Sequence, residues 1–154
     1  MNPASGIIPY VKYNNEIYFL LGYENKKWSG FVGGFEESDK TIENTAIREF
    51  NEETAGIFTN QLVFIYENML KNGILFKTKT KNRDVYIWFV EIRSENYKYY
   101  NVSERFQISK LNTTDKHFKE KEKIKWFNSK EVNDNKDLLF NLKQIIGEMK
   151  NVIK

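Results

Sequence analysis

Apolar and polar residues alternate along much of the chain, and this period of two is typical of β-strands. Residues 6–12 and 16–23 are predicted to pair as a hairpin around the polar turn Asn14-Asn15, and residues 30–33 to form a further short strand. The polar stretch 24–29 between them is predicted to be a loop. Later in the chain, two strong β-type runs and a shorter one predict strands at 62–70, 84–92 and 123–127.

Two other segments carry apolar residues at the three- and four-residue spacing of a helix face. The first begins after Thr41, a good N-cap residue, and has Glu43 in its first turn, where a carboxylate complements the helix dipole. Its apolar side and exit consist of Ile42, Ala46, Ile47, Phe50 and Ile57. The second segment, 137–153, has on one face Leu138, Leu139, Leu142, Ile145, Ile146 and Met149. This order of elements predicts an α/β fold in which a mixed sheet has a helix on each side.

The composition bounds the class of protein. A length of 154 residues predicts a single domain, 1–154, and an apolar fraction of 40% is enough for a sizeable core. No stretch approaches the roughly 18–20 apolar residues of a membrane span, and the first residues do not form a signal peptide, so a cytoplasmic location is expected. The absence of cysteine excludes disulfides and cysteine metal sites. A net charge of +3 permits an anionic substrate but does not indicate nucleic-acid binding.

The first helix carries charged residues on the side next to its apolar face. Glu49, Glu52 and Glu53 are three and four residues apart, so their carboxylates project together. Clustered carboxylates repel each other and destabilise a helix unless a cation neutralises them. Mg2+ does so, because it binds carboxylate oxygens, water and phosphate oxygens. Arg48, one turn before Glu52, can hold that side chain in place.

Two glycines, Gly33 and Gly34, precede this helix, and glycine lets a ligand approach the backbone closely. The segment from Gly33 to Ile57 resembles the Nudix box, Gly-x5-Glu-x7-Arg-Glu-U-x-Glu-Glu-x-Gly-U, in which U is aliphatic. The residues in register with it are Gly34, Arg48, Glu49, Phe50, Glu52 and Glu53. The resemblance implies a Nudix-type α/β/α sandwich and a hydrolase of diphosphates linked to another group.

The same resemblance implies roles for the site residues, with Mg2+ or Mn2+ as the cofactor. Glu52 and Glu53 would bind the metal through their carboxylates, and Gly33 through its backbone carbonyl. Glu49 would be a further ligand or the general base. Arg48 would belong to the catalytic group because it holds Glu52.

Two positions depart from the family pattern. Lys40 stands where the family has a Glu that helps to organise the metal site, and a register shift of one residue supplies Asp39 instead. Ala55-Gly56 stand where the pattern has Gly-U, and a Gly-aliphatic pair follows one residue later. A left-handed Ala55 would cost about 1 kcal/mol or more, and Gly56 can take that conformation in its place.

The resemblance also implies a further acidic ligand or base beyond the box, in a loop before an aromatic residue on a late strand. Glu122, the nearer acid to Trp126, is the predicted catalytic and metal-binding residue, and Glu120 is the alternative. Lysine and glutamate alternate along 119–123, which is also typical of a solvated segment. His117, the only histidine, is predicted to be a loop residue rather than a catalyst.

Two groups of residues are candidates for binding the substrate. Tyr23 and Trp28 flank the entrance to the box, where they can stack on a base or pack in the core or at its rim. Lys77, Lys79 and Lys81 follow each other at a period of two, so on a strand they share one face. They can bind a polyphosphate or an RNA backbone, or protect an edge strand against aggregation.

Together these features predict a Mg2+-dependent pyrophosphohydrolase of a nucleoside diphosphate-linked compound. The candidates are an mRNA cap, a dinucleoside polyphosphate, a modified nucleoside triphosphate and a diphosphoinositol polyphosphate, and the lysines favour a highly charged one. The alternative is a Nudix-fold nucleotide-binding or interaction module with little hydrolysis, because a cation at Lys40 would compete with the metal. The expected partner is a phosphorylated small molecule or capped RNA, not a membrane, and the chain is expected to be a monomer or a homodimer.

Overall fold

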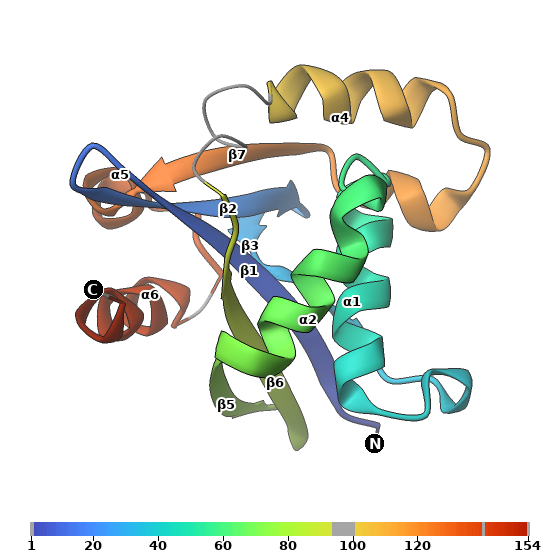
Figure 1. Ribbon diagram of the computed structural model, residues 1–154, viewed down its shortest axis with the longest axis horizontal. Coiled ribbons are helices and arrows are strands. Elements are labelled where there is room, and N and C mark those ends of the chain that lie inside the picture. The colour runs from blue at the N-terminus through green and yellow to red at the C-terminus, as the bar shows by residue number, and fades with distance from the viewer. Residues whose placement is uncertain (1, 94–100, 140, 154) are drawn as a thin grey trace.

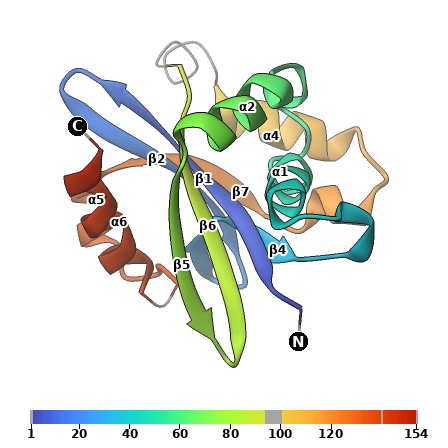
Figure 2. The ribbon, with the colours of Figure 1, turned by 60° about the horizontal axis from the view of Figure 1, so that its bottom comes forward.

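A computed structural model of the chain describes residues 2–93, 101–139 and 141–153. Within these ranges a mixed β-sheet lies between two layers of helices (Figure 1). Helices α1 (Ile42–Glu53), α2 (Leu62–Asn72) and α4 (Val102–Leu111) cover one face of the sheet, and α5 (Ser129–Asp134) and α6 (Leu142–Val152) cover the other (Figure 2). The α/β class and the sandwich with a mixed sheet predicted from the sequence are therefore confirmed.

The sheet is built around the long strand β1 (Ala4–Tyr13). One edge of β1 pairs in parallel with β6 (Arg83–Glu91), and β5 (Ile74–Thr80) pairs antiparallel with the outer edge of β6. The other edge pairs antiparallel first with β4 (Phe31–Gly34) and then with β2 (Glu16–Glu24). Strands β3 (Lys27–Ser29) and β7 (Lys123–Asn128) both pair with β2. This topology places the glycine pair of β4 beside the start of β1.

Each helical layer buries its own apolar core. The first core lies between the sheet and helices α1, α2 and α4, and it includes Ile7 and Phe31 from the strands and Phe50 from α1. The second core lies between the sheet and helices α5 and α6, and it includes Ile8, Phe19 and Phe127. Short 3-10 turns occur at Glu37–Asp39, Thr59–Gln61 and Lys116–Lys119. No helix in the described ranges is long and apolar enough to span a membrane.

Turn and capping residues in the first part of the chain predict most of the structure of that part. The turn Asn14-Asn15 has positive φ angles of 50° and 63°, as a tight two-residue hairpin requires. The hydroxyl of Thr41 caps α1 by accepting a hydrogen bond from the backbone N–H of Asn44 at 3.1 Å. The prediction of a loop over 24–29 is wrong for residues 27–29, which form strand β3. Before them, Asn25 and Lys26 form another tight turn with φ angles of 53° and 65°. Strand β3 follows this turn and returns along β2.

The prediction of a strand at 62–70 is wrong, since this segment forms helix α2. Its aromatic and β-branched residues favour a strand locally, but propensity is a weak guide where tertiary packing decides. Only Ile65 and Met69, four residues apart and hence on one helical face, are buried. Val63 and Phe64 on the other side are 67% and 71% exposed.

The helix predicted over 137–153 begins later than expected, at Leu142. The residues before it extend the edge of β3 instead: Trp28 N–H donates to the carbonyl of Asp137 at 2.7 Å, and Leu139 N–H donates to that of Trp28 at 2.9 Å. Asn141 then has a left-handed φ of 66°, which turns the chain into the helix. Helices α4 and α5 lie in segments whose structure is not predicted from the sequence above.

Candidate active site

The first feature of the site is the contact between α1 and the glycine strand β4. The carboxylate of Glu49 lies against Gly33 so closely that a Cβ atom on this glycine would overlap it. Glu49 is only 8% exposed, and Glu53, one turn later, is 3% exposed. Two acidic side chains are therefore buried side by side against a backbone that only glycine leaves open.

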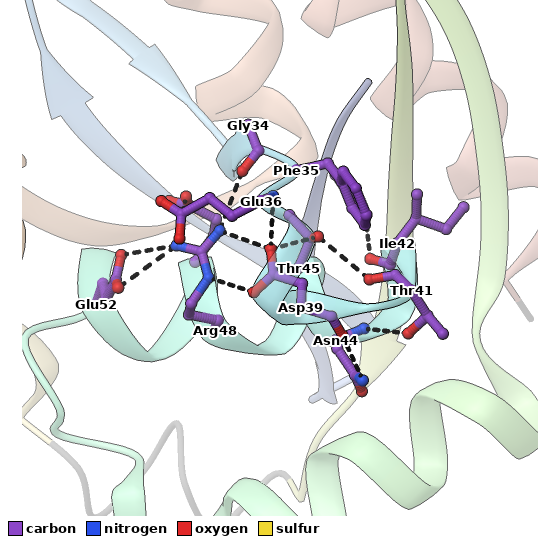
Figure 3. Close-up of polar contacts among 12 residues, drawn as sticks. Gly34, Phe35, Glu36, Asp39, Thr41, Ile42, Asn44, Thr45, Arg48 and Glu52 are labelled. Atoms are coloured by element: carbon purple, nitrogen blue, oxygen red, sulfur yellow. Dashed lines mark hydrogen bonds and ion pairs between the residues drawn. The ribbon is translucent and has the colours of Figure 1, made fainter. Parts of the chain in front are cut away.

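Arg48 joins the acidic residues around the start of α1 (Figure 3). Its Nε and Nη2 donate to the two carboxylate oxygens of Asp39 at 2.7 and 2.9 Å. Its Nη1 lies 3.0 Å from Glu49 Oε1 and 3.3 Å from Glu52 Oε2, and its Nη2 also donates to the carbonyl of Gly34 at 3.0 Å. One guanidinium thus holds Glu52, as the spacing predicts, and ties helix α1 to the glycine strand.

Asp39 supplies the carboxylate that the register shift predicts. Besides Arg48 it accepts hydrogen bonds from Thr45 Oγ1 at 2.8 Å and from the backbone N–H of Glu36 at 3.0 Å. The hydrogen bonds from Arg48 are the main reason why the pKa of Asp39 is lowered to about 2, and the bonds from Glu36 and Thr45 add to this effect. Lys40 follows with a left-handed φ of 69° and an exposed side chain. A carboxylate thus lies one residue before Lys40, and it contacts Arg48.

The other departure from the pattern, at the exit of α1, has a conformational cost. Both Ala55 and Gly56 have left-handed φ angles, of 55° and 72°. Ala55 is therefore left-handed even though Gly56 is left-handed as well, and its methyl group lies in the first core. The hydroxyl of Ser109 on α4 donates to its carbonyl oxygen.

A buried lysine completes the site. The Nζ atom of Lys121 lies 3.4 Å from Glu53 Oε1 and 3.4 Å from Glu24 Oε1, and it donates to Ser29 Oγ at 2.9 Å. Glu53 Oε1 nevertheless makes no hydrogen bond within the described part of the chain. Burial raises the pKa of Glu53 well above its usual range; the charge of Lys121 opposes this shift, and the neighbouring Glu49 adds to it.

The loop that carries Lys121 also carries the two acids predicted from the sequence. The side chain of Glu122 is exposed, and its backbone N–H donates to the carbonyl of Tyr23 at 2.8 Å. Glu120 is exposed and lies 3.5 Å from His117 Nδ1. The structure thus does not bring either acid to Glu49 and Glu53, and Lys121 between them points inward instead.

Sequence reasoning missed Lys121, Glu24 and Ser29, because an alternating run of charges is typical of solvated segments. One signal could have revealed the lysine: Gly22, in the middle of β2, where glycine weakens a strand and often marks a close approach. A Cβ atom there would lie 2.9 Å from Cδ of Lys121. The glycine leaves room for the lysine stem to pass.

A cavity of about 490 Å³ opens beside Gly33, Glu24 and Lys121. Its polar lining comes from residues of the β2–β3 and β5–β6 hairpins, among them Lys27, Thr78, Thr80 and Arg83. Its apolar wall comes from Val85, Ile87, Leu142 and Ile145. The cavity is lined by Gly33 and Lys121, which contact Glu49 and Glu53, but not by these two acids themselves.

The aromatic and lysine candidates do not line this cavity. Trp28 is buried in the second core, with its ring centroid 4.8 Å from that of Phe127, and Tyr23 lies against Trp28 at 5.1 Å. On the edge strand β5, successive side chains alternate between faces, so Thr78 points to the cavity while Lys77 and Lys79 point to the other face. Lys77 lies over the ring of Tyr86 and Lys79 pairs with Asp84 at 3.7 Å.

The chemistry of the acidic group fits a hard divalent cation. Carboxylate oxygens are the donors that Mg2+ and Mn2+ prefer, and Glu53 Oε1 is buried without a hydrogen bond. Burial and the charge of Glu49 raise the pKa of Glu52, and Arg48 opposes this shift only in part. Within the described residues no three acidic or histidine side chains converge on one point, and the guanidinium of Arg48 contacts both Glu49 and Glu52.

Comparison with known proteins gives one family and several similar folds. A family model described as NUDIX domain matches residues 6–147. An uncharacterized protein of Acanthamoeba polyphaga mimivirus is 40% identical over 62 residues, which cover 36% of this chain and 20% of that protein. The match thus spans about a fifth of the viral relative.

Two of the similar solved structures cover nearly all of this chain. An Ap4A hydrolase of C. elegans in a binary complex has a TM-score of 0.61 at 16% identity and covers 99% of this chain and 98% of its own. The NUDIX domain of Shewanella oneidensis NrtR complexed with ADP ribose has a TM-score of 0.59 at 12% identity, covering 100% and 89%. At these identities the likeness concerns the fold.

Proposed function

Because the chain belongs to the NUDIX domain family, whose enzymes hydrolyse phosphoric anhydrides, we propose that it cleaves the diphosphate of a nucleotide-linked compound with Mg2+ or Mn2+. The observation that carries the proposal is the buried pair Glu49 and Glu53, held against Gly33 on a helix that Arg48 fixes. A single domain of residues 1–154 and a cytoplasmic location belong to the proposal.

The reaction assigns a role to each residue of the group. Glu49, Glu52, Glu53 and the carbonyl of Gly33 would hold the metal, which, when bound, lowers the pKa of water and neutralises charge on the phosphates. The oxygen of a water molecule attacks one phosphorus of the anhydride, and the bond from that phosphorus to the bridging oxygen breaks. A carboxylate of the group takes the proton of the water, with Glu49 as ligand or base. Arg48 orients Glu49 and Glu52.

The cavity beside Gly33 is the proposed site of the organic part of the substrate. Its volume of about 490 Å³ is in the range of small-molecule sites and is ample for a nucleoside. No aromatic side chain of the described residues lines it, so the base would pack on aliphatic side chains such as Leu142 and Val85. The names of the neighbours, an Ap4A hydrolase and a NUDIX domain complexed with ADP ribose, support a nucleotide-linked substrate. Lys77 and Lys79 point away and give no support to an RNA substrate.

A substrate panel tests the function. Purified protein is incubated with Mg2+ or Mn2+ and dinucleoside polyphosphates, ADP-ribose, modified nucleoside triphosphates, capped RNA and a diphosphoinositol polyphosphate. Release of a nucleoside monophosphate or of phosphate, suppressed by EDTA, is the expected result. No product from any compound with either ion would rule the proposal out.

Arg83 is predicted to bind a substrate phosphate. Its guanidinium lies beside Gly34, where a Cβ atom would be 2.5 Å from Nη2, and the residue lines the cavity. Replacing Arg83 with Gln should raise KM about tenfold with little change in kcat, because it removes binding common to the ground state and the transition state. Lys79→Gln on the opposite face of the same hairpin is the control and should leave both constants unchanged. Equal effects of the two variants on KM would show that Arg83 and the cavity do not bind the substrate.

A second candidate function is a nucleotide-binding module with little hydrolysis. One observation favours it: the ammonium of Lys121 lies beside Glu53, where a cation competes with a divalent metal. Lys40, the original reason for this alternative, is exposed. The panel separates the two functions, because a module would bind a nucleotide in calorimetry without releasing product.

A further inference from the structure

We propose that the ammonium group of Lys121 takes the place of one divalent ion of the hydrolytic site, beside Glu53 and Glu24. The inference rests on the proposed function, since it concerns the same acidic group. It predicts that the wild-type site loads fewer divalent ions, or binds them more weakly, than its carboxylates alone would allow.

The contacts of Lys121 are those of a cation-binding position. Its Nζ lies between Glu53 Oε1 and Glu24 Oε1 at 3.4 Å from each, and the third contact is Ser29 Oγ at 2.9 Å. All three partners are oxygen atoms, from α1 and from the two strands of the β2–β3 hairpin. Hard divalent cations bind oxygen atoms of the same kinds. The ammonium therefore occupies a site whose donors suit either type of cation.

The fold holds Lys121 in this position from both ends. Gly22 leaves space for its stem, since a Cβ atom there would meet Cδ at 2.9 Å. Its backbone carbonyl accepts a hydrogen bond from Lys110 Nζ on α4 at 2.7 Å. The next residue, Glu122, donates its N–H to the carbonyl of Tyr23 on β2. Lys121 is only 3% exposed, whereas Lys119 and Lys123 in the same segment are exposed.

The electrostatic consequence follows from the distances. Glu53 is almost fully buried, so its charge needs a partner, and Lys121 gives it one without a metal. A second cation bound to the same oxygen atoms would lie within a few ångströms of the ammonium. At such distances, repulsion between charges is strong inside a protein. Removing the lysine charge should therefore open a position for a divalent ion.

Calorimetry with Mn2+ alone tests this inference. Lys121→Met keeps most of the length of the side chain but removes the charge, and it should bind Mn2+ at least about tenfold tighter than wild type, or bind one more equivalent. Lys121→Arg keeps the charge and should bind Mn2+ as wild type does. Lys119→Met is the control for an exposed lysine of the same loop and should also match wild type.

The thermal stability of the same variants gives a second readout. Without metal, Lys121→Met should melt at a lower temperature than wild type, since Glu53 and Glu24 lose their counter-ion, and Mn2+ should raise its Tm more than that of wild type. If this variant does not fold, Lys121→Gln, whose amide can still donate to Ser29, takes its place with the same expectation. Equal Mn2+ affinity and equal number of sites in wild type and the neutral variant would overturn the inference.

These measurements contain no substrate, so they are independent of the hydrolysis assay. A protein that cleaves none of the panel compounds but whose Lys121→Met variant gains Mn2+ refutes the proposed function and supports the lysine assignment. A protein that hydrolyses a substrate but binds Mn2+ equally with and without the lysine supports the proposed function and refutes the lysine assignment.

Discussion

Replacing Glu53 with Gln is expected to lower kcat by about a thousandfold while KM changes little, because a metal ligand acts on the chemical step rather than on binding alone. Glu53 is 3% exposed, and its Oε1 makes no hydrogen bond within the described part of the chain and has the ammonium of Lys121 at 3.4 Å, so this oxygen already faces a cation. Glutamine has nearly the same shape but no charge. Steady-state kinetics on the best panel substrate, with Glu67→Gln on the exposed side of α2 as the control, measures the effect. A kcat within tenfold of wild type would remove Glu53 from the ligand set.

The same substitution, which should lower activity, should raise the stability of the metal-free protein. Burial raises the pKa of Glu53 in the folded state, so above the ordinary carboxyl pKa the folded state binds more protons than the unfolded state. Stability therefore falls as the pH rises from the acid range toward the raised pKa, and an uncharged glutamine removes this loss. In urea unfolding with EDTA at about pH 8, Glu53→Gln should be more stable than wild type, because Lys121 keeps Glu24 as its partner while the buried carboxyl is removed. A less stable variant would show that the pair with Lys121 outweighs the burial of the charge.

The sequence predicts the part of the site that depends on local spacing. Glu49, Glu52 and Glu53 share a helix face because residues three and four apart do so in any helix, and Thr41 marks where that helix begins. Asp39 is also predictable, since the turn before the helix brings it back to Arg48 over nine positions. These relations are short in sequence, and tertiary packing did not alter them.

The remaining features depend on contacts between segments that are distant in the sequence. Lys121 enters the site because Gly22, about a hundred residues earlier, leaves space for it, and nothing within its own charged loop indicates burial. Lys77 and Lys79 share a face, as the period of two predicts, but the partner strand and α6 decide that the cavity lies on the other face. Helix α2 was predicted as a strand for a similar reason: whether Val63 and Phe64 are buried is decided by what packs against them.

Replacing Arg48 with Met should reduce both stability and activity. The side chain joins Asp39, Glu49, Glu52 and the carbonyl of Gly34, so its loss leaves a largely buried carboxylate without its main partner. Breaking a buried pair in this way costs about 3 kcal/mol, and somewhat less here because the Arg48 side chain is 24% exposed. Glu52 and Glu49 also lose their fixed positions, so kcat should fall by about a hundredfold or more. Arg48→Lys, which keeps the charge but not the planar fork, should recover only part of either loss.

Asp39→Asn supplies the matching half of a double-mutant cycle and a pH dependence that identifies the pair. The pKa of Asp39 is lowered to about 2 in the folded protein, chiefly by Arg48, against an ordinary value of about 3.9. A lowered carboxyl pKa contributes stability that is present above the ordinary value and is lost as the pH falls through the lowered one. Wild type should thus exceed Asp39→Asn by about 2 kcal/mol near neutral pH, and the gap should close between about pH 4 and pH 2. In urea unfolding, the double variant Asp39→Asn/Arg48→Met should lose less stability than the sum of the single losses, because each substitution removes the same bond. Additive losses, together with a gap that does not change between pH 4 and pH 2, would show that Asp39 and Arg48 act independently and that Asp39 does not take the role of the family carboxylate.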